Sequence, residues 1–179
     1  VAIGLTGEAA CRQGEFFEAV AFAVERCLPV LFVVEDNHLG ISTVTDGLTP
    51  LSLGMLEGLP VTKVNARDPE GVFEAARTVL TRVRGGEGPA ILWCDLDRLD
   101  SHTSFDDQRA YLAEETIRAK WERDPVAVSI TRLVATGCLS EQDVTEMRAR
   151  VADQVSSAFG EVLEEPEPSA VEALQDRLG

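Results

Sequence analysis

The chain has 179 residues, enough to build one well-packed domain or one domain with a modest extension. Its net charge is −15, from 31 acidic and 16 basic residues, and such a surface repels the phosphates of nucleic acids and of anionic lipids. No apolar run approaches the ~18 residues that a membrane span requires. We therefore expect a soluble protein without nucleic-acid or membrane partners.

The cysteines and the first residues indicate where the protein works and how it begins. The cysteines are widely spaced, form no CxxC pair and lie mostly in apolar context, which is typical of reduced thiols in a core; they are Cys11, Cys27, Cys94 and Cys138. Residue 1 lies inside an apolar strand pattern, with no signal peptide or initiator Met before it. We expect a cytoplasmic protein whose sequence is cut from a longer chain.

Two apolar runs near the start predict buried strands. VAIGLTG (1–7) and PVLFVVED (29–36) lack polar alternation, which is typical of strands buried on both faces of a parallel sheet. Between them, bracketed by Gly14 and Pro29, apolar residues recur every three or four positions and predict an amphipathic helix. Residues 1–36 are therefore expected to form a βαβ unit.

The middle of the chain continues the alternation of strand and helix. A glycine-rich loop follows the second strand, with a short helix expected after Thr49-Pro50. PVTKVNA (60–66) and PAILWCDL (89–96) predict two more strands. Between these strands, Asp68 is expected to cap a helix that starts at Pro69 and carries a clear apolar stripe.

Beyond residue 97 the pattern becomes helical. A polar loop leads into helices expected near 108–121, 125–136 and 141–163, and Ser140 begins a capping box for the last of them. The sequence thus predicts an α/β fold, a mostly parallel sheet with flanking helices followed by a helical C-terminal region. We divide the chain into an α/β domain, 1–103, and a helical extension, 104–179.

Polar residues follow three of the predicted strands. They are Gly7-Glu8-Ala9-Ala10, Asp36-Asn37-His38 and the loop from Arg98 to Asp107. Because ligands collect beyond the carboxyl ends of parallel strands, Glu8 and Asn37 are candidate oxygen ligands for Mg²⁺. Small residues in the first turn would let a diphosphate approach the backbone. Taken alone, the residues are equally compatible with ordinary solvated turns.

The loop after the fourth strand carries one of only two histidines, His102. A lone loop histidine is more often a surface residue than a catalyst, and the hydroxyls of Thr103 and Ser104 are equally unremarkable. Arg98 and Arg109 can either neutralise a phosphate or pair with the acids nearby. From the residues alone we expect ion pairing.

The order of these pieces resembles the thiamine diphosphate signature, in which Gly-Asp-Gly is followed after about two dozen residues by an Asn pair. Gly7-Glu8-Ala9, 26 intervening residues and Asp36-Asn37 reproduce that layout. The string GEAACRQGEFFEAVAFAVERCLPVLFVVEDNHLGIST closely resembles the alpha subunit of 2-oxo acid dehydrogenases of the pyruvate, branched-chain and acetoin type. GPAILWCDLDRLDSHTSFDDQRAYLAEE and DPVAVSITRLVATGCLSEQD extend the resemblance to about residue 168.

The resemblance implies a cofactor site with thiamine diphosphate and Mg²⁺. Glu8, Asn37 and the carbonyl of Leu39 take the metal-ligand positions, and Gly7, Glu8, Ala9 and Ala10 lie against the diphosphate. His102 takes the position of the catalytic loop histidine beside the cofactor. Thr103 stands where kinases phosphorylate a serine in some relatives.

The resemblance also implies a function and a set of partners. The chain is expected to be a fragment of the alpha subunit, anchoring the metal and diphosphate for the oxidative decarboxylation of a 2-oxo acid. Its partners would be a beta subunit, in a heterotetramer, and a lipoyl-bearing acyltransferase that accepts the acyl group. A homodimer of the fragment is the alternative assembly.

Three departures from the family pattern support a second hypothesis. Ala9 replaces the second glycine, and its Cβ can crowd the diphosphate; Asp36 replaces the first Asn and adds negative charge beside an anion; Leu112 replaces an Arg of the loop. The alternative function is a degenerate alpha-like domain with a structural or assembly role and no cofactor. An unrelated nucleotide-binding α/β domain is a third possibility.

Overall fold

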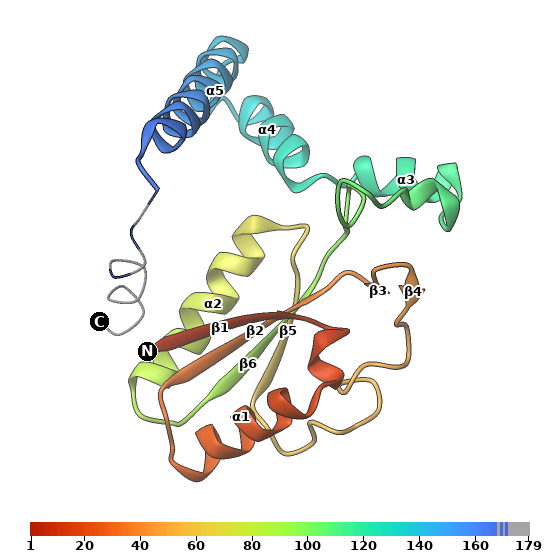
Figure 1. The fold of residues 1–179 in the computed structure, drawn as a ribbon, viewed down its shortest axis with the longest axis vertical. Coiled ribbons are helices and arrows are strands. Elements are labelled where there is room, and N and C mark those ends of the chain that lie inside the picture. Colours follow the sequence, from red (N-terminus) through yellow and green to blue (C-terminus); the bar gives the residue numbers. More distant parts are fainter. Residues whose placement is uncertain (168, 170, 172–179) are drawn as a thin grey trace. The chain divides into compact units, whose positions relative to one another are not determined.

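The computed structural model describes residues 1–167, 169 and 171. The chain divides into two compact units, Val1–Ser129 and Ile130–Gly179, which we describe separately. The first unit contains a four-stranded sheet of β1 (Ala2–Gly7), β2 (Val30–Asp36), β6 (Ala90–Asp95) and β5 (Val61–Asn65), in that spatial order (Figure 1). Every neighbouring pair is parallel, which confirms the predicted α/β sheet.

Two helices cover opposite faces of the sheet because successive strand residues point to opposite sides. Helix α1 (Gly14–Glu25) packs Phe16 and Val20 into a cluster with Ile91 and Trp93. Helix α2 (Pro69–Arg84) packs into the other cluster, which contains its own Val79 and Val83 and the strand residues Leu31, Leu92 and Cys94. The central strand β6 therefore serves both cores, as its unbroken apolar run predicts.

Two-sided burial, however, is wrong for β1. Ile3 and Leu5 are 53% and 69% exposed. Among the described strands β1 pairs only with β2, at the edge of the sheet. In register, Ile3 lies beside Leu31, which belongs to the core on the α2 side, but that core cluster includes no residue of β1. An apolar run identifies a strand without identifying what covers it.

The loop between β2 and β5 also differs from expectation. Leu39–Gly40 (β3) and Thr43–Val44 (β4) form a short antiparallel hairpin, which the sequence did not reveal. The short helix expected after Thr49-Pro50 is wrong, since residues 49–58 form a series of turns. Gly54 and Gly58 have positive φ angles, which interrupt helical propagation.

Helix starts were predicted with mixed success. The capping box at Ser140 is confirmed, with Ser140 and Asp143 each accepting from the other's backbone N–H. Helix α2 starts at Pro69 with Asp68 at the N-cap position, as predicted, but the Asp68 side chain makes no capping hydrogen bond. Its carboxylate instead lies next to Gly71.

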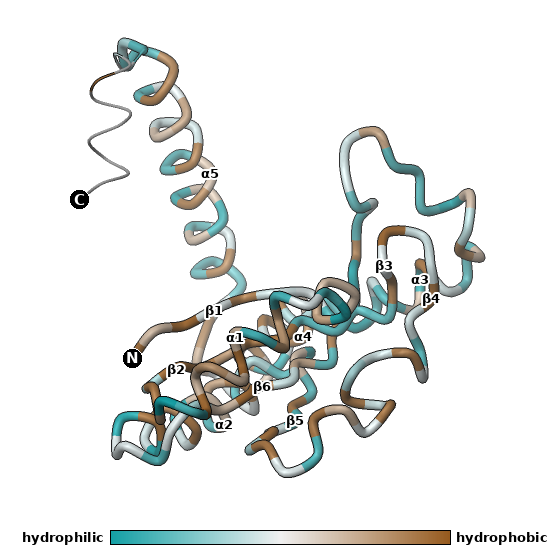
Figure 2. The backbone as a smooth tube through the Cα atoms, turned by 60° about the horizontal axis from the view of Figure 1, so that its bottom comes forward, coloured by the Kyte–Doolittle hydropathy of each residue, from teal (hydrophilic) through white to brown (hydrophobic). Residues whose placement is uncertain are grey.

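The C-terminal elements are helices, as expected. The predicted helix over 108–121 is split into a 3-10 turn, Gln108–Ala110, and α3 (Glu114–Trp121). These are followed by α4 (Pro125–Ala135) and α5 (Glu141–Glu164), where polar and apolar residues alternate as in an amphipathic helix (Figure 2). Within the described chain no helix is both long and apolar enough to cross a membrane.

The domain boundary drawn at residue 103 stays a prediction. The first compact unit extends beyond that residue and includes α3. All four cysteines are free thiols. Cys11 and Cys94 are buried, as expected for core thiols, but Cys27 and Cys138 are exposed.

Candidate functional site

Glu8 follows β1 at the carboxyl edge of the sheet and is almost completely buried, with 1% of its surface exposed. Its backbone N–H donates to the carbonyl of Glu35 on β2, 3.2 Å away, which continues the parallel pairing by one residue. Its carboxylate accepts a hydrogen bond from the hydroxyl of Thr45 at 2.9 Å. The first predicted ligand is thus held in the interior by the loop that follows β4.

Among the described residues, no ion pair includes Glu8, and the hydrogen bond that its carboxylate accepts comes from the neutral hydroxyl of Thr45. A buried carboxylate without a positive partner is unfavourable, so such a group calls for a cation or a proton. This environment fits an oxygen ligand of a hard divalent cation. The described residues contain no group of three or more His, Cys, Asp or Glu side chains that could hold a metal, so carbonyl and amide oxygens would have to complete the set.

Ala9 does not direct its methyl group toward open space. A Cβ built on Gly40 would lie 3.0 Å from the Cβ of Ala9, so the Ala9 methyl packs against the glycine backbone of β3. The turn after β1 and the hairpin after β2 are therefore in direct contact. The methyl that distinguishes Ala9 from the family's glycine thus has a packing partner in Gly40.

Asn37 and Leu39 form a tight turn directly after β2. The side-chain oxygen of Asn37 accepts a hydrogen bond from the backbone N–H of Leu39 at 3.0 Å. This Asx turn fixes the side-chain amide of Asn37 relative to the backbone that carries the carbonyl of Leu39. The amide oxygen and this carbonyl are the two other predicted metal ligands. Leu39 is buried, which anchors the end of the turn.

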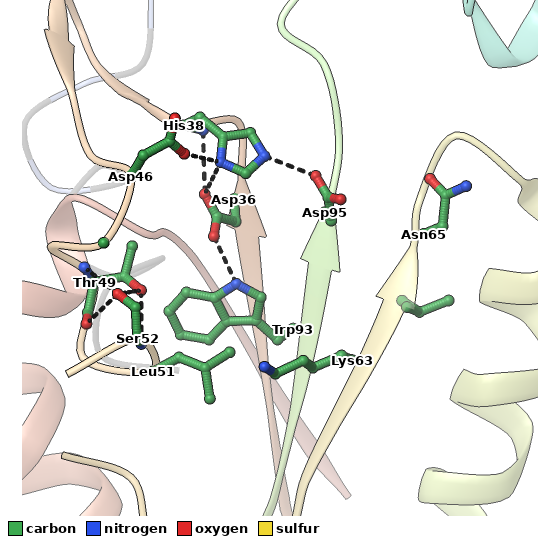
Figure 3. A pocket seen from close by; sticks show the side chains of 12 residues that line it. Asp36, His38, Asp46, Thr49, Leu51, Ser52, Lys63, Asn65, Trp93 and Asp95 are labelled. Carbon is green, nitrogen blue, oxygen red and sulfur yellow. Dashed lines mark hydrogen bonds and ion pairs between the residues drawn. The ribbon is translucent and has the colours of Figure 1, made fainter. Parts of the chain in front are cut away.

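Asp36 is buried and turned toward β6. One carboxylate oxygen accepts from the indole N–H of Trp93 at 2.8 Å, and the other accepts from the backbone N–H of His38 at 3.1 Å (Figure 3). Both oxygens are thus engaged by protein donors. Asp36, which stands where the family signature has Asn, therefore links the end of β2 to β6 and to the turn that follows.

His38 has a left-handed backbone, with φ of 65°, and is a residue to which the sequence assigned no role. Its Nε2 lies 2.8 Å from Asp95 and its Nδ1 2.7 Å from Asp46. Although burial lowers the pKa of His38, the hydrogen bond to Asp95 and the surrounding carboxylates outweigh this effect and raise the pKa overall. The surrounding carboxylates thus favour the protonated form of this ring.

His102 lies on an exposed part of the loop after β6. Its backbone N–H donates to Asp106 at 2.8 Å, and no hydrogen bond or ion pair in the described chain joins its ring to Glu8 or Asn37. Arg98, at the start of this loop, connects it to the hairpin β3–β4. Its guanidinium group donates to the carbonyl of Ile41 at 2.8 Å and to the hydroxyl of Tyr111 at 2.6 Å. The ion pairing expected for Arg98 is thus replaced by neutral acceptors.

A cavity of about 390 Å³ opens at the ends of β2, β5 and β6, lined in part by Asp36, His38, Lys63 and Trp93 (Figure 3). Neither Glu8 nor Asn37 lines it. The cavity and the predicted metal ligands are therefore separate features of one sheet edge, joined through Asp36 and His38. An indole N–H in an otherwise apolar strand was the sequence signal for this link, because a buried Trp normally finds an acceptor.

Comparison with known proteins assigns a family. The family described as the dehydrogenase E1 component matches residues 1–171. The alpha subunit of 2-oxoisovalerate dehydrogenase from Bacillus subtilis is 30% identical over 96% of this chain and 52% of its own length. The chloroplastic pyruvate dehydrogenase E1 component subunit alpha-3 of Arabidopsis thaliana is 29% identical over 98% of this chain and 42% of its own.

A third relative acts on a different substrate. The alpha subunit of acetoin:2,6-dichlorophenolindophenol oxidoreductase from Cupriavidus necator is 29% identical over 98% of this chain and 54% of its own length. The chain thus spans about half the length of the curated relatives it matches. The chain belongs to the dehydrogenase E1 component family, as its resemblance to the alpha subunits of 2-oxo acid dehydrogenases predicts.

Proposed function

We propose that this chain is part of an alpha subunit of a 2-oxo acid dehydrogenase and anchors Mg²⁺ and the diphosphate of thiamine diphosphate. The observation that supports this most directly is Glu8, a fully buried carboxylate at a strand end with no cationic partner in the described chain. Asn37 and the carbonyl of Leu39 would complete the oxygen ligands. Thiamine diphosphate, when bound, supplies the electron sink for decarboxylation.

The residues of the chain would divide the remaining tasks. Gly7, Ala9 and Ala10 form the turn whose backbone the diphosphate would approach, and the Ala9 methyl packs on Gly40. His102 would act beside the cofactor, on a loop that Arg98 ties to Ile41. The reaction would release carbon dioxide from a 2-oxo acid and pass the acyl group to the lipoyl domain of an acyltransferase.

The same family membership supports a proposal for the assembly. The relatives' names call them alpha subunits, and we propose a beta subunit as the partner of this chain in a cytoplasmic heterotetramer. A fragment without this partner would be inactive. The alternative is a degenerate, cofactor-free alpha-like domain, which the departures at Ala9, Asp36 and Leu112 favour; Ala9 and Asp36 have packing and hydrogen-bond partners within the chain.

Calorimetric titration of the protein expressed from its complete gene, with any co-purifying beta subunit, tests the proposal. We expect thiamine diphosphate to bind only with Mg²⁺, and Glu8→Gln to weaken binding at least tenfold, since a ligand charge is lost. Glu18→Gln makes the same change at an exposed position of α1 and should bind like the wild type. Absence of binding by the wild-type protein at millimolar cofactor would favour the degenerate alternative.

A further inference from the structure

A chain of hydrogen bonds connects the interior of β6 to the turn that carries Asn37. Trp93 is buried and donates its indole N–H to Asp36 at 2.8 Å. The second oxygen of Asp36 accepts from the backbone N–H of His38 at 3.1 Å. Asp36 thus constrains Asn37 from both sides. It precedes Asn37 in the chain, and its carboxylate accepts the hydrogen bond from the residue after Asn37, His38.

His38 adds two more anchors to the same turn. A left-handed φ is uncommon for a residue with a side chain and needs support from its surroundings. Asp95 at the end of β6 and Asp46 in the following loop hold the two ring nitrogens at 2.8 and 2.7 Å. The turn that carries Asn37 is therefore held both by β6 and by the loop after β4.

The same network reaches the other predicted ligand. The carbonyl of His38 accepts a hydrogen bond from the backbone N–H of Thr45 at 3.0 Å, and the hydroxyl of Thr45 donates to Glu8 at 2.9 Å. Thr45 is 1% exposed, so water does not compete for these bonds. One continuous path thus runs from Trp93 through the Asn37 turn to the carboxylate of Glu8.

We propose that Trp93, Asp36, His38 and Thr45 are positioning residues that hold the oxygen ligands of the metal site in place. This inference rests on the proposed function and goes beyond it, because none of the four residues is itself a predicted ligand. It also gives the charged departure from the family signature a role, because the Asp36 carboxylate accepts hydrogen bonds from Trp93 and from the backbone of His38. Residues that orient metal ligands typically change metal affinity 10–100-fold when they are replaced.

Two pairs of variants test the proposal by Mg²⁺ titration in the presence of thiamine diphosphate, with thermal unfolding measured in parallel. Trp93→Phe keeps an aromatic ring but removes the N–H, and Trp121→Phe makes the same change on α3, away from the network. Thr45→Val removes the hydroxyl at nearly constant volume, whereas Thr45→Ser keeps it. We expect Trp93→Phe and Thr45→Val to weaken Mg²⁺ binding about tenfold, with Thr45→Ser and Trp121→Phe near wild type.

The outcomes separate this inference from the function on which it rests. If the wild-type protein binds Mg²⁺ and Trp93→Phe and Thr45→Val bind it with the same affinity, the network has a purely structural role, even if both variants melt at lower temperature. This result overturns the inference but not the proposed function. Equal losses in Thr45→Val and Thr45→Ser also overturn it, because the hydroxyl would then be irrelevant. If the wild-type protein does not bind Mg²⁺ and cofactor, the proposed function fails and this inference fails with it.

Discussion

Asp97 shows how a single side chain can fix the end of a strand. Its carboxylate follows β6, is 6% exposed and is gripped by two guanidinium groups, those of Arg67 and Arg123. Each arginine donates through Nε to one oxygen and through Nη2 to the other. Such paired bonds are the strongest class of side-chain ion pair. This clamp ties the loop after β5 to the segment between α3 and α4 within the first unit.

We predict that Asp97→Asn lowers the free energy of unfolding by about 3 kcal/mol, because it leaves two guanidinium groups without their shared carboxylate. Arg123→Met should lower it by about 1 kcal/mol or less, since Arg123 is half exposed and Arg67 still holds Asp97. Urea unfolding at pH 7 measures both. Equal effects of the two changes would contradict the view that burial of the carboxylate decides the outcome.

The same carboxylate predicts a pH dependence. Burial alone raises the pKa of Asp97, but the hydrogen bonds from Arg67 and Arg123 outweigh it and lower the pKa from 3.8 to about 2. Its stabilising contribution is therefore complete above about pH 5, where the carboxylate is ionised in the folded and unfolded states alike, and is lost as the pH falls through 3.8 toward 2. The difference in stability between wild type and Asp97→Asn should be constant above about pH 5 and shrink below it. A difference that grows in acid would refute this assignment.

At the scale of elements, the turn after β1 and the hairpin β3–β4 are fitted to each other by one methyl group. Ala9 contacts Gly40 so closely that an added Cβ on Gly40 would lie 3.0 Å from the Ala9 Cβ. We predict that Gly40→Ala lowers the free energy of unfolding by about 1–2 kcal/mol through overpacking. Thermal or urea unfolding measures the change.

The double variant Ala9→Gly with Gly40→Ala supplies the decisive comparison. Removing the Ala9 methyl makes room for the new one, so we expect the pair to recover part of the stability lost in Gly40→Ala alone, a coupling that a double-mutant cycle isolates. Gly14→Ala is a matched control, because a Cβ there meets nothing within 4 Å. Strictly additive effects at positions 9 and 40 would show that the two elements do not depend on this contact.

At the scale of the whole molecule, the sequence predicted the order of strands and helices but not their neighbours. Periodicity reveals which residues are buried together within one element, which is why the four long strands and their helices were found. It does not reveal that β1 lies at an edge, nor that Trp93 meets Asp36 across 57 positions. The position of the turns with Glu8 and Asn37 at one sheet edge was predictable because the ends of parallel strands gather there, whereas the role of Thr45 was not, because only the folded hairpin brings it to Glu8.

The acid excess is a property of the whole molecule and gives the last prediction. With a net charge of −15, like charges repel one another across the folded surface more strongly than in the expanded chain. Salt screens this repulsion, with a Debye length that falls from ~30 Å at 0.01 M to ~10 Å at 0.1 M. We therefore expect the melting temperature to rise by about 2–4 °C over this range, which corresponds to roughly 1 kcal/mol.

Comparison of two salts at equal ionic strength separates screening from site binding. NaCl acts only through ionic strength, so Glu8→Gln and wild type should gain the same number of degrees, apart from the single charge removed. MgCl₂ should stabilise the wild type further, because a ligand that binds only the folded state shifts unfolding by mass action, and Glu8→Gln should lose this extra gain. A melting temperature that stays constant or falls with NaCl would mean that local contacts already balance the acidic side chains. An extra stabilisation by MgCl₂ that persists in Glu8→Gln would mean that the cation binds elsewhere on the acidic surface.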